Sequence, residues 1–380
     1  NIISSIDGLL GTSISDGLGQ WTFTPSLAIS SGIHEVTVTA TDLAGNTSMA
    51  SAALNVTIDT ESPSVITFTI SETQLAIGQT ATVTITFSEA VTGLTNADFT
   101  AANGTLSGLS TVNGGLTWTA TLTPQNDVVD ASNILQLDNT GYADLAGNPG
   151  SGVSASDNYA VDTQRPVVVS FMVSDTQLTT VEISLVTITF SEAVTGLTAA
   201  DFTVANGTLS GLSTADGGIT WTATLTPDNG VEDPTNVITL DNTGYTDLAG
   251  NSGTGTTDSN NYTVETQVPT AILSVNDIQL ILGETTTVTV TFSEAVTGLT
   301  VADFTVGNGT LSGLSTADGG ITWTATLTPD NGVENPTNVI TLDNTGYQDA
   351  AGNAGTGTTD SNNYAVDTQR PTVITFTISE

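Results

Sequence analysis

The chain has 380 residues, with 39 acidic side chains against two basic ones and no cysteine. Its formal net charge of −37 excludes nucleic acid as a partner, because phosphate contacts need Lys and Arg, and it disfavours anionic membrane surfaces. Disulfides and thiolate chemistry are excluded as well. No apolar run approaches the ~20 residues that a membrane-spanning helix needs, so we expect no membrane insertion in this segment.

An internal repeat determines the expected organisation of the chain. Pro63, Pro166, Pro269 and Pro371 open the same pattern, at spacings of 103, 103 and 102 residues. Two 81-residue stretches that end at Pro269 and Pro371 align without a gap and are identical at 72 positions. Such similarity indicates duplication of one structural unit, which makes separate catalytic roles for the copies implausible.

The repeat predicts the domain boundaries. We expect a partial domain at 1–62, full repeats at 63–165, 166–268 and 269–370, and the start of a further repeat at 371–380. In the partial domain, Trp21-Thr22-Phe23-Thr24-Pro25 echoes a strand of the full repeats, but the first strands of the pattern are missing. This part should be poorly stable alone, because half of its sandwich is absent.

Strands dominate each full repeat. In the repeat 166–268, Val186, Ile188 and Phe190 alternate with polar residues, as in a half-buried strand, and no segment keeps a helical period. The expected strands are 167–174, 185–191, 202–206, 208–214, 219–226, 237–241 and 261–265. Seven antiparallel strands in about 100 residues predict an all-β fold, a tandem array of seven-stranded immunoglobulin-like β-sandwich domains.

Turn signals separate these strands. Asn206-Gly207 favours a type I′ hairpin between the strands 202–206 and 208–214. Asp216-Gly217-Gly218 marks a second turn, before the strand 219–226. The strand count depends on the first of these breaks.

Acidic residues recur at corresponding places in every repeat. An odd number of antiparallel strands puts the two termini at opposite poles, so the loops after the second, fourth and sixth strands share one pole with the incoming linker. The loop after the second strand begins with Glu and ends with Asp, the loop after the sixth carries Asp-Leu-Ala-Gly-Asn or a variant, and the linker adds an acid. The predicted metal ligands are Asp42, Asp59, Glu89, Asp98, Asp144, Asp162, Glu192, Asp201, Asp247, Glu265, Glu294, Asp303 and Asp349.

At the Pro63 junction the predicted set is Asp59, Glu89, Asp98 and Asp144. Four converging carboxylates repel one another, so either some are protonated or a cation lies among them. Oxygen ligands on flexible loops suit Ca²⁺, which takes about six to eight of them, while one His and no Cys argue against zinc. The simpler alternative, that each Asp only bonds its own tight turn, stays open.

Several motifs carry a resemblance to a known family. Thr-Phe-Ser-Glu-Ala-Val-Thr-Gly-Leu, Ala-Asp-Phe, Trp-Thr-Ala-Thr-Leu-Thr-Pro, Asp-Leu-Ala-Gly-Asn and the linker Val-Asp-Thr-Gln-Arg-Pro resemble the bacterial Ig-like repeats of giant RTX-type adhesins and biofilm-associated surface proteins. The resemblance covers nearly the whole chain, with residues 1–62 resembling a shorter repeat subtype.

That resemblance implies a function. The family's repeats form a structural extender, or stalk, that projects an adhesive tip from the bacterial cell surface, with Ca²⁺ rigidifying the domain junctions. It further implies type I secretion, an extracellular location and a monomeric extended rod whose partners are calcium ions and neighbouring repeats. One departure is Glu265, with Val268 in place of Arg, so that junction is expected to bind metal differently.

An enzyme is not expected, because the only histidine, His34, lies outside the full repeats and no nucleophile–base arrangement recurs. The competing hypothesis is a glycan- or protein-binding module. Trp118, Trp221 and Trp323 share the inward face of their strands, which favours a core role. Tyr142, Tyr245 and Tyr347 are expected to pack at the pole of the sandwich.

Overall fold

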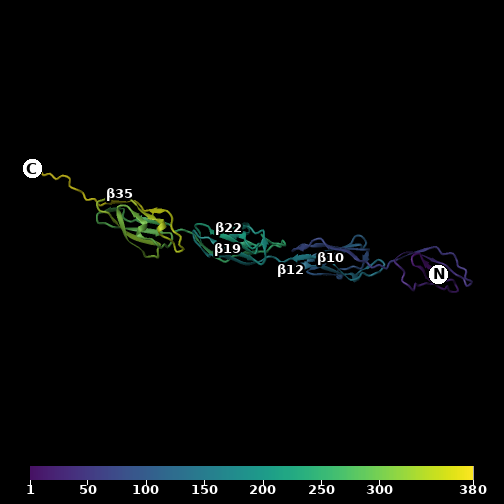
Figure 1. The fold of residues 1–380 in the computed structure, drawn as a ribbon. Coiled ribbons are helices and arrows are strands. Elements are labelled where there is room, and N and C mark those ends of the chain that lie inside the picture. The colour runs from purple at the N-terminus through teal and green to yellow at the C-terminus, as the bar shows by residue number, and fades with distance from the viewer. Residues whose placement is uncertain (380) are drawn as a thin grey trace. The chain divides into compact units, whose positions relative to one another are not determined.

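The structure, a computed structural model, describes residues 1–379, and the predicted all-β class is confirmed, with strands throughout and only short 3-10 turns besides. The described chain divides into two compact units: Asn1–Arg165 with Ala249–Asn251, and Pro166–Leu248 with the residues from Ser252 onward. Each repeat folds as a sandwich of its own (Figure 1). Among the described residues, no helix has the length and apolar character to cross a membrane.

Residues 1–62 form a single sheet rather than a sandwich. Its strands, in the order β2-β1-β3-β4, are β1 (Ile2–Ser4), β2 (Gly8–Gly11), β3 (Gly32–Val38) and β4 (Leu54–Ile58). The segment around Trp21 forms no strand, and the Trp21 side chain is 45% exposed. Its counterpart in the full repeats pairs with a strand that this part of the chain lacks, which explains the difference.

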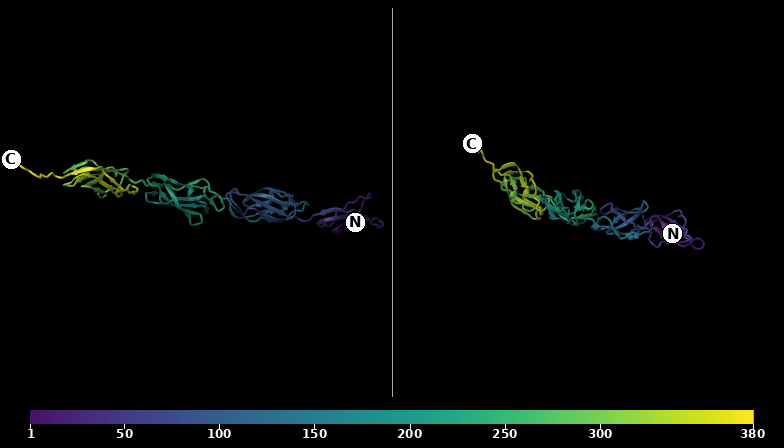
Figure 2. Two further views of the ribbon diagram at one scale, coloured as in Figure 1. Left: turned by 90° about the horizontal axis from the view of Figure 1, so that it is seen from above. Right: turned by 45° about the vertical axis from the view of Figure 1, so that its right-hand side comes forward.

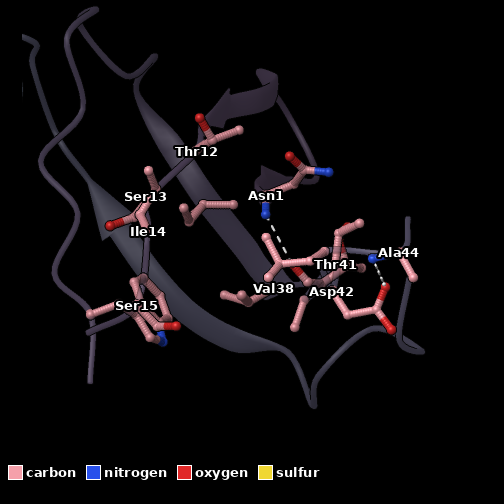
Figure 3. A pocket seen from close by; sticks show the side chains of 14 residues that line it. Asn1, Thr12, Ser13, Ile14, Ser15, Val38, Thr41, Asp42 and Ala44 are labelled. Carbon is pink, nitrogen blue, oxygen red and sulfur yellow. Dashed lines mark hydrogen bonds between the residues drawn. The ribbon is translucent and has the colours of Figure 1, made fainter. Parts of the chain in front are cut away.

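The open face of that sheet is hollowed. The hollow is lined by Ile2, Ile14, Trp21 and Val38 among others (Figure 3). The Asn1 ammonium group donates a 2.9 Å hydrogen bond to the Thr39 carbonyl at its edge. Of the apolar side chains that line the hollow, Ile14 and Trp21 are exposed, whereas Ile2 is buried.

The three full repeats share one order of elements. The repeat 63–165 contains β5 (Val65–Ile70), β6 (Gln74–Leu75), β7 (Ala81–Phe87), β8 (Val91–Thr92), η1 (Asn96–Asp98), β9 (Phe99–Ala101), β10 (Gly104–Thr111), β11 (Thr117–Pro124), β12 (Val129–Asn133), β13 (Leu135–Asp138), η2 (Asn139–Gly141), β14 (Ala143–Asp144), β15 (Val153–Ala155) and β16 (Tyr159–Asp162). The repeat 166–268 contains β17 (Val168–Val173), β18 (Gln177–Leu178), β19 (Ser184–Phe190), β20 (Val194–Thr195), η3 (Ala199–Asp201), β21 (Phe202–Val204), β22 (Gly207–Thr214), β23 (Thr220–Pro227), β24 (Glu232–Asn236), β25 (Ile238–Asp241), β26 (Thr246–Asp247), β27 (Thr256–Asp258) and β28 (Tyr262–Glu265). The repeat 269–370 contains β29 (Ala271–Val275), β30 (Gln279–Ile281), β31 (Thr286–Phe292), η4 (Val301–Asp303), β32 (Phe304–Val306), β33 (Gly309–Thr316), β34 (Thr322–Pro329), β35 (Glu334–Asn338), β36 (Ile340–Asp343), η5 (Asn344–Gly346), β37 (Thr358–Asp360) and β38 (Tyr364–Asp367).

Two sheets face each other in each repeat. In 166–268 the first sheet has the order β17-β19-β23-β22, and the opposing face is built from β18-β28-β24 and β21-β25-β27. This is the division of strands into A-B-E-D and C-F-G that defines an immunoglobulin-like sandwich. The β18–β28 pair is parallel and fastens the second part of the first strand to the last one.

The core follows from the alternation of side chains along the strands. In β19, Val186, Ile188 and Phe190 are buried while the residues between them face outward. Tyr245 packs its ring edge-on against Phe190, with ring centroids 4.8 Å apart. Tyr142 and Tyr347 are buried in the same way, so the predicted packing role of these tyrosines is confirmed. The tryptophans, exemplified by Trp221, pack half-buried against the core.

The break at Asn206-Gly207 exists, but the predicted hairpin there is wrong. β21 pairs with β25, whereas β22 pairs with β23, so the chain crosses between the sheets at this point. Asn206 takes a positive φ of 53°, and its amide donates to Asp233 Oδ2 at 3.0 Å and Asn236 Oδ1 at 2.7 Å. A crossing and a hairpin need the same left-handed residue, which is why local sequence did not separate them.

The second predicted turn is confirmed, and it lies at the expected pole. β22 and β23 form the hairpin, in which Thr220 N donates to Asp216 Oδ1 at 2.9 Å. Val194 N donates to the Gly218 carbonyl at 3.1 Å, and β20 pairs with β26. The three loops predicted to share one pole therefore do so.

Residues 371–379, expected to begin a further repeat, form no strand (Figure 2). Their sequence from Val373 repeats that of β5, and in β5 the strand is formed by pairing with β7. Glu380 lies outside the described residues.

Replacing Gly244 with Ala should destabilise the repeat 166–268, because the added Cβ would overlap Oδ1 of Asp201. Overpacking of this kind costs about 1–3 kcal/mol. In an Asp201→Ala background the overlap is relieved, so the cost should be smaller, and chemical denaturation of the four proteins of this cycle measures the difference. An equal cost in both backgrounds would contradict the predicted close approach.

Candidate metal centre

Three of the predicted acids gather at the Pro63 junction. Asp59 follows β4, Glu89 follows β7, and Asp144 ends β14. One carboxylate oxygen from each lies within 4.8 Å of the other two. The three side chains come from the incoming linker and from two different loops of the next domain, so a cation bound by them would tie the linker to that domain.

Asp144 is held by its own turn. Its Oδ1 accepts hydrogen bonds from the amides of Ala146, Gly147 and Asn148, at 2.7–2.8 Å, and its Oδ2 accepts one from the Asn148 side chain at 2.7 Å. Gly147 has a φ of 98°, a conformation that favours glycine. Asp144 thus forms the tight turn of Asp-Leu-Ala-Gly-Asn, and its buried carboxylate also lies within 4.8 Å of those of Asp59 and Glu89.

Electrostatics at this group follow from burial and hydrogen bonding. Burial alone would raise the pKa of Asp144, but the hydrogen bonds from Asn148, Gly147 and Ala146 lower it below its usual value. The pKa of Glu89 is raised, by burial first and then by the charges of Asp59, Asp144 and Glu61. The group therefore combines a carboxyl whose pKa is lowered by its turn with one whose pKa is raised by burial and by neighbouring charges.

Asp98, Asp201 and Asp303, predicted at the same pole, lie in a different environment. Each ends a 3-10 turn and accepts hydrogen bonds on Oδ2 from the threonine before it, as Asp201 does from the Thr198 amide at 2.7 Å and hydroxyl at 2.9 Å. The carboxylates that gather among the described residues do not include them. The structure thus shows them stabilising their own loop.

The Glu265 junction brings a second group together within the second unit. Glu265 ends β28, Glu294 follows β31, and Asp349 opens the turn that ends at Asn353. The pKa of Glu265 is raised to about 7, by burial first, then by the charge and hydrogen bond of Asp349 and the charge of Glu294. Oε1 of Glu294 is buried without a hydrogen-bond partner.

Glu232 adds a further charge to this group. It lies opposite Glu265 on the neighbouring strand, and its charge contributes to raising the pKa of Glu294, after burial and the charge of Asp349. At the corresponding place in β12 the chain has Val129, opposite Asp162. The Glu265 junction thus differs from the preceding one at two positions, Glu265 on β28 and Glu232 on β24, as expected.

The remaining predicted ligands are placed as follows. Asp162 ends β16 in the first unit, whereas Glu192 follows β19 and Asp247 ends β26 in the second unit. Asp42 accepts a hydrogen bond on Oδ1 from Ala44 N at 2.9 Å (Figure 3). The same oxygen accepts a second one from Asn46 N at 2.8 Å. Asp42 thus opens the same turn as Asp144, in the domain that lacks an opposing sheet.

The final asparagine of the turn was missed by sequence reasoning. Asn148 Nδ2 donates to the Asp59 carbonyl at 3.1 Å, and Asn353 Nδ2 donates to the Glu265 carbonyl at 3.0 Å. Asn353 Oδ1 also accepts from the Thr180 amide, at 3.0 Å, in the loop before β19. The available signal was the recurrence of Asn at the end of every Asp-x-x-Gly-Asn motif, which was assigned to the turn alone.

The linker between the second and third full repeats is held from both sides. Thr266 is bonded to its own repeat, through its hydroxyl to the Asp228 carbonyl at 2.6 Å and its amide to the Val231 carbonyl at 2.7 Å. The neighbouring Glu265 carbonyl is bonded to Asn353 of the following repeat. Adjacent linker residues are thus anchored to different domains, which restricts rotation between them.

Comparison with known proteins shows the family to which these repeats belong. Residues 59–161, 162–264 and 265–366 match a family model described as a bacterial Ig-like domain, and residues 2–60 match a second model with the same description. The chain belongs to the bacterial Ig-like domain family. In the long repeats the matches to this family begin at the linker acids Asp59, Asp162 and Glu265. No curated protein sequence matches the chain.

Solved structures similar to this bacterial Ig-like chain include the Escherichia coli adhesin FdeC, at 16% identity and a TM-score of 0.30, covering 79% of this chain and 96% of that one. Tandem Ig repeats of Dlar match at 10% identity and a TM-score of 0.18, covering 54% and 97%. A marsupial T cell receptor matches at 12% identity and a TM-score of 0.25, covering 74% and 95%.

Replacing Asn353 with Ala should loosen its junction without unfolding either repeat. The variant leaves the Glu265 carbonyl and the Thr180 amide without their partner, at a cost of about 1–3 kcal/mol for buried groups. Hydrogen exchange of the Thr180 amide should accelerate, while that of core amides in β19 stays unchanged. Asn46→Ala is the matched control, because Asn46 bonds only within its own turn. An unchanged Thr180 exchange rate would argue against the contact of Asn353 with the preceding repeat.

Without metal, stability at the Glu265 junction should fall as the pH rises. The folded-state pKa of Glu265, about 7, exceeds its usual 4.5, so protonated Glu265 stabilises the fold fully below 4.5, and this contribution is lost as the pH rises through 7. Thermal melting in chelator between about pH 5 and pH 8 measures the effect. Glu265→Gln should flatten the dependence of the melting temperature on pH. Asp367→Asn, at the corresponding position of the next repeat, is the control and should not. Identical pH profiles for the wild type and both variants would refute the assignment.

Proposed function

We propose that this chain is a structural extender of a bacterial surface protein, with Ca²⁺ bound at its domain junctions. The observation that carries the proposal is the convergence of Asp59, Glu89 and Asp144 from a linker and two loops. Carboxylate oxygens are the ligands that Ca²⁺ prefers, and the absence of Cys from the chain argues against zinc. Bound Ca²⁺ would neutralise the three carboxylates and fix the linker to the loops.

The same role is proposed for the acids of the Glu265 junction, where the longer Glu side chain replaces Asp. Asp162, Glu192 and Asp247 stay predicted ligands from their sequence positions. The hydrogen bonds of Asn148 and Asn353 to the linker carbonyls support a junction whose geometry is already set before a cation binds. Binding would then cost little reorganisation. Millimolar extracellular Ca²⁺ would saturate even weak sites of this kind.

An extender role is supported by repetition. Repeats that are identical at most positions lengthen the protein rather than provide a series of different sites. A net charge of −37 opposes binding to nucleic acid and aggregation through strand edges. We therefore propose that the protein is non-enzymatic and extracellular, with calcium ions and its own neighbouring repeats as partners.

Calcium should raise the melting temperature of the chain, because it binds the folded state and adds ~2.7 kcal/mol to the free energy of unfolding when free Ca²⁺ is 100 times Kd. Glu89→Gln keeps the shape of the side chain but removes a charged ligand, so calorimetric titration should show one site weakened about tenfold or more. Glu72→Gln, which removes an exposed carboxylate elsewhere, is the control. Equal titrations for both variants, or no calcium effect on melting, would remove Ca²⁺ from the proposal.

A further inference from the structure

One face of the repeat 166–268 carries exposed apolar side chains. Met172 on β17, Leu185 on β19 and Ile183 just before β19 are 52%, 53% and 62% exposed. All three are on the outward face of the sheet β17-β19-β23-β22, because the residues that alternate with them, Val173, Ser184 and Val186, are buried. Exposed apolar side chains that gather in this way are a mark of interaction surfaces.

The two other full repeats provide an internal comparison. At the positions of Met172, Ile183 and Leu185 they carry only hydroxyl side chains. These are Thr69, Thr80 and Thr82 in one repeat and Ser274, Thr285 and Thr287 in the other, all exposed. Since both of those repeats form the same sandwich, the fold itself does not require apolar residues here.

The three side chains follow one another along one face, and together they are called the strip below. Met172 lies opposite Thr187, and Leu185 is the next outward residue along β19, diagonal to Met172. Ser174 N bonds to the Leu185 carbonyl at 2.9 Å, which holds the two strands together at this end. Diagonal neighbours on one face are within reach of long side chains, so a partner can contact all three.

Carboxylates border this strip. Asp175 follows β17, and its Oδ1 accepts from Gln177 N at 3.0 Å. Glu182, next to Ile183, accepts on Oε2 from Thr179 N at 3.0 Å. Both acids are exposed and fixed by these turns, so the strip has an apolar centre and a negatively charged edge.

We propose that this strip, Met172, Ile183 and Leu185, is a docking surface for a polypeptide segment that is apolar at its centre and basic at its flanks. The apolar side chains of the partner cover the strip, and its Lys or Arg side chains lie against Asp175 and Glu182. The partner packs on the face, since Asn260 already occupies the Val173 amide and carbonyl, at 2.7 and 3.1 Å, at the end of edge strand β17. This goes beyond an extender role, because it assigns recognition to one repeat.

Charge decides against a second copy of the chain as the occupant. With 39 acidic and two basic residues, a second copy would bring the same carboxylates to the same edge. Like charges opposed across an interface disfavour association, whereas a basic partner gains both attraction and a faster encounter.

The test uses the full chain and a synthetic peptide that alternates Lys and Leu, with a Lys-Ser peptide of equal length and charge as the probe control. The variant Met172→Thr/Ile183→Thr/Leu185→Thr takes residues that the other repeats tolerate. Calorimetry should show Lys-Leu binding weakened about tenfold or more in this variant, and Lys-Ser binding unchanged. The variant Ser274→Met/Thr285→Ile/Thr287→Leu, in the repeat that has Asp277 and Glu284 at the positions of Asp175 and Glu182, should gain a second Lys-Leu site.

Other outcomes would overturn the proposal. Equal Lys-Leu affinity in the wild type and the threonine variant would show that the strip is not a docking surface, as would a stoichiometry unchanged by the gain-of-site variant. Sedimentation that reveals a wild-type dimer lost in the threonine variant would assign the strip to a second copy instead. Calcium binding tests the extender proposal separately, since none of these substitutions touches a junction.

Discussion

Hydrogen bonds from three successive backbone amides fix the Asp144 carboxylate, and the rest of the junction depends on this arrangement. They orient the turn so that Asn148 reaches the carbonyl of the incoming linker. They also lower the pKa of this carboxyl, which lies next to those of Glu89 and Asp59. One short motif thus supplies the turn, the contact between domains and the candidate ligand, which explains why its Asp, Gly and Asn occur together in each copy.

The Glu265 junction shows how substitution alters the same construction. A longer acid replaces Asp in the linker, and Glu232 stands on the neighbouring strand where an earlier repeat has Val129. Burial and mutual repulsion then raise the pKa of Glu265 and Glu294, whereas the turn that holds Asp349 keeps its hydrogen bonds. Junction chemistry can therefore vary along the array while the backbone contact through Asn353 is retained.

The repeats also divide their residues between two purposes. Inward positions such as Val186 and Ile188 recur with little change, because close packing tolerates few alternatives. Outward positions are free of this constraint, and the apolar strip around Leu185 arises by substitution there alone. A scaffold with a fixed core and free outer faces can acquire a binding surface in one copy without disturbing the junctions that join it to its neighbours.

The sequence by itself determined the all-β class, the recurrence of one unit, most strands and the buried face of each, because alternation of period two and repetition can be read directly from the chain. It also indicated that Glu89 and Asp144 share a pole, since strand parity follows from counting. Only the tertiary structure decided that the chain crosses between sheets at Asn206, that Asp98 is engaged by its own loop, and that Asn353 reaches another repeat. Each of these depends on which distant group lies within hydrogen-bond distance, and a left-handed turn or a lone carboxylate looks the same locally whichever partner it finds.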